Sequence, residues 1–148
     1  MRSAPTWRGC SHAGRRAVSA RDANESLVRT LFDAFARKDA FGLRGLFADD
    51  AVWHVAGASL MAGTYEGRDA IFRFLARLPK ETDGTYGSRL IDVLASDDRA
   101  AALYRATGSR LGRHLDLDQL LLFRFADDRI IEVVALPTDP AEFDAFWA

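Results

Sequence analysis

The chain has only one cysteine and three histidines among its 148 residues. Cys10 therefore has no partner for an internal disulfide, and no set of cysteines and histidines shows the spacing of a zinc site. The glycine-rich phosphate loop and the HExxH and GxSxG motifs are absent too, as is any apolar run of the roughly 20 residues that a membrane helix needs. We therefore expect a cytoplasmic protein with no metal, no cofactor and no membrane partner.

Neither sign of charge dominates, because 20 basic residues oppose 21 acidic ones and give a formal net charge of −1. Such a chain has no general positive field to attract nucleic acid. Hydrophobic residues make up 49% of the sequence, which suits a single domain of this length with a sizeable core.

The first 21 residues differ from the rest. They contain five arginines, no acidic residue and no helical or strand period. We predict a disordered tail over residues 1–21, which an early start codon would explain, with an organelle transit peptide as the alternative. A folded domain is expected over residues 22–148.

Helix signals come first in this domain. Asp22 with Glu25 has the spacing of a capping box, and Asp39 is a second candidate N-cap. A third helix is expected from about Asp69 until Pro79 stops it, and Pro140 begins a short final helix. Apolar residues recur at helical spacing in the first helix: Leu27, Val28, Leu31, Phe32 and Phe35.

The sequence predicts a short strand at residues 51–55 and longer strands after the third helix. Four longer segments, at 85–95, 99–110, 113–125 and 129–136, are separated by short turns, which predicts an antiparallel meander. Helices before a curved antiparallel sheet indicate an α+β fold in which the helices close one face of the sheet.

The segment 113–125 alternates in its first half, but residues 120–123 are apolar on both faces. A strand buried on both sides needs a cover over each. The second cover is a second sheet or another copy of the chain. We predict a symmetric homodimer with Leu120 and Leu122 near its centre and Asp118 and Arg124 at its rim.

Few polar residues interrupt the predicted strands. His54 would titrate near neutral pH, although alternation sends it outward if its neighbours point inward. Arg105 would stabilise a substrate oxygen if it faces inward, and otherwise Tyr104 faces inward. Gln119 on an apolar face is either a ligand contact or a structural bond. His114, Asp116 and Asp118 are typical of a solvated face.

Three stretches resemble the SnoaL-like branch of the nuclear-transport-factor-2-like superfamily. They are LFADDAVWH at residues 46–54, GTYEGRDAI at 63–71 and FRFADDRI at 123–130. The resemblance implies a cone-shaped α+β barrel with one apolar pocket between sheet and helices, and a dimer formed through the outer face of the sheet. Members include ketosteroid isomerases, polyketide cyclases, dehydratases and proteins that only bind or assemble.

The ketosteroid isomerase pattern fails here, because its general base, its oxyanion-hole acid and its tyrosine would fall on Val55, Leu121 and Leu31. That chemistry requires carboxyl groups. The same registration implies that Leu103 and Arg105 face inward. The expected site has His54 as acid or base, Arg105 as oxyanion stabiliser, Gln119 as orienting group, and walls from Trp53, Val55, Tyr65, Leu103, Leu117 and Leu121.

Two functions stay open. One is a cofactor-independent lyase, isomerase or cyclase that acts on a small apolar molecule with a carbonyl or enolisable oxygen. The other is a non-catalytic ligand-binding domain or dimeric scaffold. A fold does not choose between them.

Overall fold

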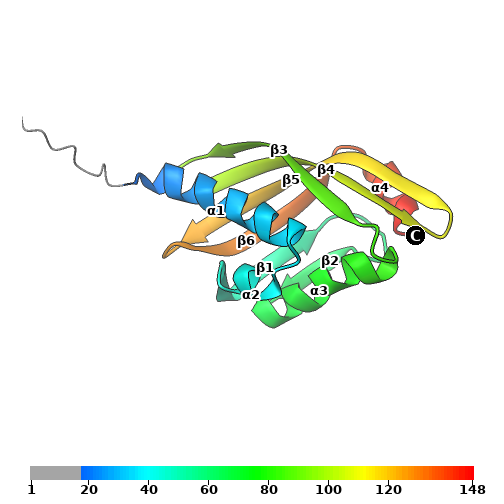
Figure 1. Ribbon diagram of the computed structural model, residues 1–148, viewed down its shortest axis with the longest axis horizontal. Coiled ribbons are helices and arrows are strands. Elements are labelled where there is room, and N and C mark those ends of the chain that lie inside the picture. The colour runs from blue at the N-terminus through cyan, green and yellow to red at the C-terminus, as the bar shows by residue number, and fades with distance from the viewer. Residues whose placement is uncertain (1–17) are drawn as a thin grey trace, which may run out of the picture.

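A computed structural model describes residues 18–148, and it confirms the α+β plan (Figure 1). In chain order the elements are α1 (Ala20–Ala36), α2 (Ala40–Arg44), β1 (Phe47–Val55), β2 (Gly63–Glu66), α3 (Arg68–Glu81), β3 (Gly87–Ala95), β4 (Arg99–Arg110), β5 (Arg113–Ala126), β6 (Arg129–Pro137) and α4 (Pro140–Phe146).

The six strands form one curved sheet in the order β2-β1-β6-β5-β4-β3. The predicted antiparallel meander runs from β3 to β6, but β1 pairs with β6 in parallel. A long intervening chain, and not a short turn, connects these two strands, so nothing forces them to be antiparallel. Register shifts at Leu90/Asp92 and Arg124/Phe125 are irregularities of the kind that bend a sheet.

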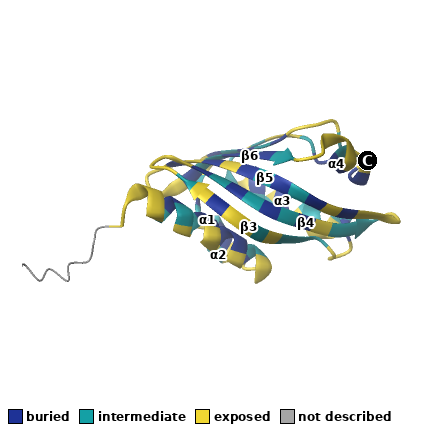
Figure 2. Cartoon of the chain, turned by 90° about the horizontal axis from the view of Figure 1, so that it is seen from above, coloured by how far each residue is buried: buried dark blue, intermediate teal, exposed yellow. Residues whose placement is uncertain are grey.

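The helices cover the concave face of this sheet. α1 packs on β3 and β4, α3 packs on β1 and β2, and α4 closes the far end against β5 and β6. Along β5 the residues facing the helices are buried, whereas the alternate residues are more exposed (Figure 2). Leu120 and Leu122 lie on the convex face, as the period of the segment predicts, and Leu122 remains 40% exposed. No helix within residues 18–148 is both long and apolar enough to cross a membrane.

α1 begins earlier than the sequence predicts, whereas α2 begins where expected. Ser19 caps α1, because its hydroxyl accepts a hydrogen bond from the backbone of Asp22 at 3.1 Å. Ala20 and Arg21 are therefore helical, and the predicted tail is too long at this end; its residues 1–17 lie outside the described part of the chain. Asp39 caps α2 as predicted, with Oδ1 accepting from Gly42 N at 2.9 Å.

Pro79 does not stop α3, which continues to Glu81. A proline loses its own backbone donor and crowds the carbonyl four residues before it, but these effects concern the preceding turn, and Lys80 and Glu81 after it keep the helical conformation. The hydroxyl of buried Thr82 donates to Leu78 O at 2.7 Å and satisfies one of the carbonyls at the end of the helix.

Candidate functional site

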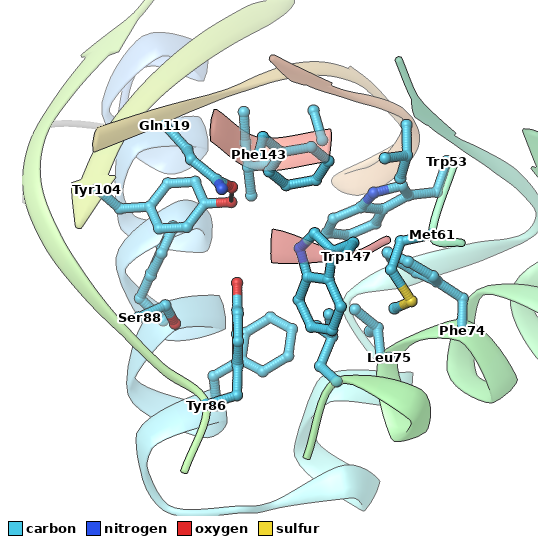
Figure 3. A pocket seen from close by; sticks show the side chains of 16 residues that line it. Trp53, Met61, Phe74, Leu75, Tyr86, Ser88, Tyr104, Gln119, Phe143 and Trp147 are labelled. Atoms are coloured by element: carbon cyan, nitrogen blue, oxygen red, sulfur yellow. Dashed lines mark hydrogen bonds between the residues drawn. The ribbon is translucent and has the colours of Figure 1, made fainter. Parts of the chain in front are cut away.

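A cavity of about 40 Å³ lies between the concave face of the sheet and the helices (Figure 3). Its walls are mostly aromatic and aliphatic, and they come from α1, α3, α4, the central strands and the loop after β1. Trp147, just after α4, is 1% exposed and closes one end. Within the described part of the chain, no charged side chain lines the cavity.

A polar pair interrupts this apolar wall. Tyr104 on β4 and Gln119 on β5 are direct cross-strand neighbours, and the Tyr104 hydroxyl donates to Gln119 Oε1 at 2.6 Å. Both side chains are buried, with exposed fractions of 5% and 4%. A hydrogen bond that bridges two strands in an apolar setting fixes the orientation of both groups.

Two donors in the cavity wall have no partner. Gln119 Nε2 and Trp53 Nε1 are both buried, and neither makes a hydrogen bond within residues 18–148. Leaving a buried N–H group unsatisfied costs about 1–3 kcal/mol. Both side chains line the same space in Figure 3, so an acceptor atom placed there would remove this penalty.

Two further hydroxyls complete the polar side of the cavity. Tyr86 precedes β3 and points its hydroxyl into the space beside Tyr104, and Ser88 lies on β3 (Figure 3). Burial raises the pKa of Tyr86 to about 12, against a smaller lowering effect of Tyr104. Burial, and then the neighbouring Tyr86, raise the pKa of Tyr104 well above its usual value. Both phenols therefore stay protonated at neutral pH and remain hydrogen-bond donors.

A family model of the SnoaL-like domain matches residues 28–133. The chain belongs to the SnoaL-like domain family. The solved neighbours show that its fold is that of the nuclear-transport-factor-2-like superfamily.

Individual relatives of this SnoaL-like domain match over most of its length. The uncharacterised protein Rv0034 of Mycobacterium tuberculosis is 38% identical over 128 residues, which are 86% of this chain and 98% of that protein. The structure of Bal32a, from a soil-derived mobile gene cassette, is 36% identical with a TM-score of 0.85, and the match covers 88% of this chain and all of that one (100%). A protein of unknown function with a cystatin-like fold from Xanthomonas campestris is 27% identical, with a TM-score of 0.79 and coverage of 84% and 97%.

Four of the predicted wall and orienting residues line the cavity of this SnoaL-like domain: Trp53, Val55, Gln119 and Leu121. Three others do not. Tyr65 lies behind the wall, where its ring stacks on Phe74 with centroids 4.3 Å apart and its hydroxyl donates to Met61 O at 2.8 Å.

Leu117 is buried but does not reach the cavity. Leu103 lies on the convex face, because the buried residues of β4 are those of the opposite parity.

His54 lies on the convex face, outside the cavity. Its Nδ1 is 3.1 Å from Thr64 Oγ1, and its Nε2 is 3.5 Å from Glu132 Oε2. Trp53 and Val55 face inward, and β1 pairs regularly with β2 at this point, so alternation directs His54 outward. The structure does not bring it near the Tyr104 and Gln119 pair.

Arg105 also lies on the convex face, so its expected inward position is wrong. Its Nε is 2.6 Å from Asp116 Oδ1, and its Nη1 is 3.0 Å from Asp118 Oδ1. Hydrogen bonds to these two carboxylates raise the pKa of Arg105, and the pKa of Asp116 is lowered in return. The alternative, that Tyr104 faces inward, is correct.

The charged face of β5 behaves as a surface. His114 Nδ1 is 3.0 Å from Ser109 Oγ on β4, and Asp116 and Asp118 bind Arg105. These contacts link neighbouring strands on the solvent side. They agree with the interpretation of a solvated face and not with an acid–base cluster.

Sequence reasoning missed Tyr86, Ser88, Phe143 and Trp147 as cavity residues. Phe143 and Trp147 carry a signal, because they are apolar residues in a short terminal helix that needs a surface to cover. The sequence gives no such signal for Tyr86 and Ser88, because its pattern does not show which residues at the start of β3 face inward.

Proposed function

We propose that this SnoaL-like domain binds a small apolar molecule through one carbonyl or hydroxyl oxygen, which the amide of Gln119 holds. The observation that supports this most is the buried Gln119 Nε2, a donor without a partner beside an apolar cavity. Buried polar groups are normally satisfied, so an unpartnered one needs an explanation, and a ligand oxygen beside it would supply one. Trp53 Nε1 is a second free donor on the same cavity.

The chemistry of the walls favours binding and polarisation over proton transfer. Within residues 18–148 the cavity presents phenols, an amide, a hydroxyl and an indole, but no carboxylate and no imidazole. General acid–base catalysis needs a group whose pKa lies near the working pH. Neutral donors aimed at one point stabilise negative charge on an oxygen. The catalytic form of the proposal is therefore a cofactor-independent cyclase, isomerase or lyase in which the substrate carries its own base or nucleophile.

The test is isothermal titration calorimetry with acetophenone, a small aromatic ketone. Gln119→Leu keeps a side chain of similar volume and removes its donor, so we expect the dissociation constant to rise about tenfold or more, as for a lost hydrogen bond to a buried group. Asp118→Asn is the matched control, because residue 118 is the next one on β5 but faces the solvent side. Equal affinity of wild type and Gln119→Leu for acetophenone would refute the proposal.

A second role is assembly, and the convex face supports it. Leu103, Leu120 and Leu122 are neighbours there on β4 and β5, and Leu122 is 40% exposed. Arg105 and Arg124, both in ion pairs, stand on the same face of these strands. An apolar centre with a charged border is the usual anatomy of an interface between proteins. We propose a symmetric homodimer formed through this face.

Sedimentation velocity at micromolar concentration tests the dimer. The wild type is expected to sediment as a dimer, and the double variant Leu120→Asp, Leu122→Asp as a monomer, because like charges would meet across the two-fold axis. Asp116→Ser on the same face, further along β5 from Leu120 and Leu122, is the control and should leave the dimer intact. A compact wild-type monomer would rule this assembly out.

A further inference from the structure

A second hollow, larger than the cavity, lies on the helical side of the molecule. It is a groove of about 500 Å³ between α1, α2, α3 and the start of β3. Its walls are mainly apolar and include Leu43 on α2 and Phe72 on α3. Of the described residues that line it, Lys38 alone carries a charge, and it stands exposed on the rim after α1.

The groove and the cavity adjoin. The same five side chains line both spaces: Phe35, Leu75, Leu78, Tyr86 and Ser88. Tyr86 forms the partition, since its hydroxyl points into the cavity toward Tyr104 (Figure 3) while the residue also lines the groove. A ligand atom in the cavity is therefore one side chain away from the groove.

The two volumes decide what fits. A cavity of about 40 Å³ has room for a few water-sized groups, such as a carbonyl and its nearest atoms. Binding sites for drug-sized molecules have volumes of roughly 300–1,000 Å³, and the groove with about 500 Å³ lies in that range. A drug-sized ligand whose oxygen lies in the cavity needs room outside it for most of its atoms, and the adjoining groove is large enough.

We propose that cavity and groove form one site for an elongated apolar carbonyl compound. Its oxygen lies against Gln119 and Tyr104, and its hydrocarbon body passes Tyr86 and lies along α3 toward α2. This inference rests on the proposed function for the inner end of the ligand. It adds that length, and not only the oxygen, determines affinity.

A series of ketones that differ only in length tests the inference. Acetophenone and its para-ethyl, para-butyl and para-hexyl derivatives are titrated calorimetrically into the wild-type protein. Each methylene group that leaves water on binding should improve the affinity by about fourfold, the equivalent of about 0.8 kcal/mol. A compact site limited to the cavity would instead bind the longer members no better than acetophenone.

Ala76→Trp fills the groove from α3, and Ala36→Trp fills it from α1. Both alanines are exposed and line the groove without lining the cavity, so neither change disturbs the core. Each should abolish the gain in affinity from acetophenone to its para-hexyl derivative. Ala145→Trp on α4 is the control, since Ala145 is exposed and lines neither space.

The outcomes separate the two proposals. If Gln119→Leu weakens acetophenone but both groove variants keep the full dependence on chain length, the elongated site is refuted and the proposed function stands. If affinity rises with length in the wild type but Gln119→Leu weakens no member of the series, the groove binds apolar chains and the placement of the carbonyl is refuted. Loss of the length dependence in Ala145→Trp as well would also refute the groove.

Discussion

Gln119→Leu should separate stability from binding in this protein. In the native state the amide of Gln119 accepts one hydrogen bond, from Tyr104 at 2.6 Å, and leaves its Nε2 donor unsatisfied. Leucine has nearly the same volume and no polar atoms. The substitution therefore removes one good hydrogen bond and one buried group that lacks a partner.

The two effects have opposite signs and similar size. Loss of the acceptor for the Tyr104 hydroxyl lowers the free energy of unfolding by about 1–2 kcal/mol, and removal of the unsatisfied amide N–H raises it by about 1–3 kcal/mol. We expect the free energy of unfolding to change by less than about 1 kcal/mol. Tyr104→Phe has no such compensation, since it leaves the whole amide of Gln119 without a partner, and should cost about 2 kcal/mol. In a chain of 148 residues that lowers Tm by about 4–8 °C.

Urea denaturation followed by tryptophan fluorescence measures these changes, because Trp53 and Trp147 line the cavity. The double variant Tyr104→Phe, Gln119→Leu should be about as stable as the wild type, which gives a coupling energy of about 1–2 kcal/mol. If the two single changes are additive, or if Gln119→Leu alone costs more than about 3 kcal/mol, the amide is a structural group and the reasoning fails. Acetophenone titration of the same variants should show weaker binding wherever Gln119 is replaced.

Three further predictions concern other parts of the molecule. Asn24 is 6% exposed, and its side chain donates to Ser96 O and Asp97 O at 3.0 Å each, which connects α1 to the turn between β3 and β4. Asn24→Leu should therefore lower the free energy of unfolding in urea by about 2–3 kcal/mol. The control Ser26→Ala, on the exposed side of α1, should change it little. The pKa values of all three tyrosines are raised above the usual 10.0, that of Tyr86 to about 12. Their contribution to stability is therefore complete below pH 10 and is lost as the pH rises through the raised pKa values. Absorbance at 295 nm should show little tyrosinate at pH 10.5 in the folded protein and much in urea. Arg105→Leu should leave the acetophenone dissociation constant within about twofold of wild type, as for a change on a remote surface, and a larger loss would place Arg105 in the site after all.

The architecture could be predicted from the sequence because its signals are local and repeat over many residues. The apolar period of α1, the Asp39 cap and the short turns between the last four strands each depend on neighbours in the chain. The parallel pairing of β1 with β6 depends on contacts between distant segments. No local pattern encodes it.

The orientation of β4 shows why the site was harder to predict. Residues 100–106 read AAALYRA, with small or apolar side chains on both parities. The inner parity contains Ala102 and Ala106, which leave room where α1 packs closely and Phe32 lies 5.3 Å from the Tyr104 ring. Alanine is compatible with either face, so only Leu103, Tyr104 and Arg105 distinguish the two faces. The available signal that Arg105 faces solvent was its pairing with two aspartates of β5, Asp118 directly opposite and Asp116 two residues away.

The separation of charge between the two faces of the sheet limits what the cavity can recognise. On the convex face, Arg105 binds Asp116 and Asp118, and Glu132 lies between His54 and Arg124. Among the described residues, the polar groups that line the cavity are neutral, and burial keeps the phenols protonated. A carboxylate brought into such a cavity would lose its hydration and find no cation, a cost that neutral donors only partly offset. A ketone or alcohol loses less hydration, and the donors of Gln119 and Trp53 have no other partner in the described chain. We therefore expect the proposed site to prefer neutral oxygens over acids.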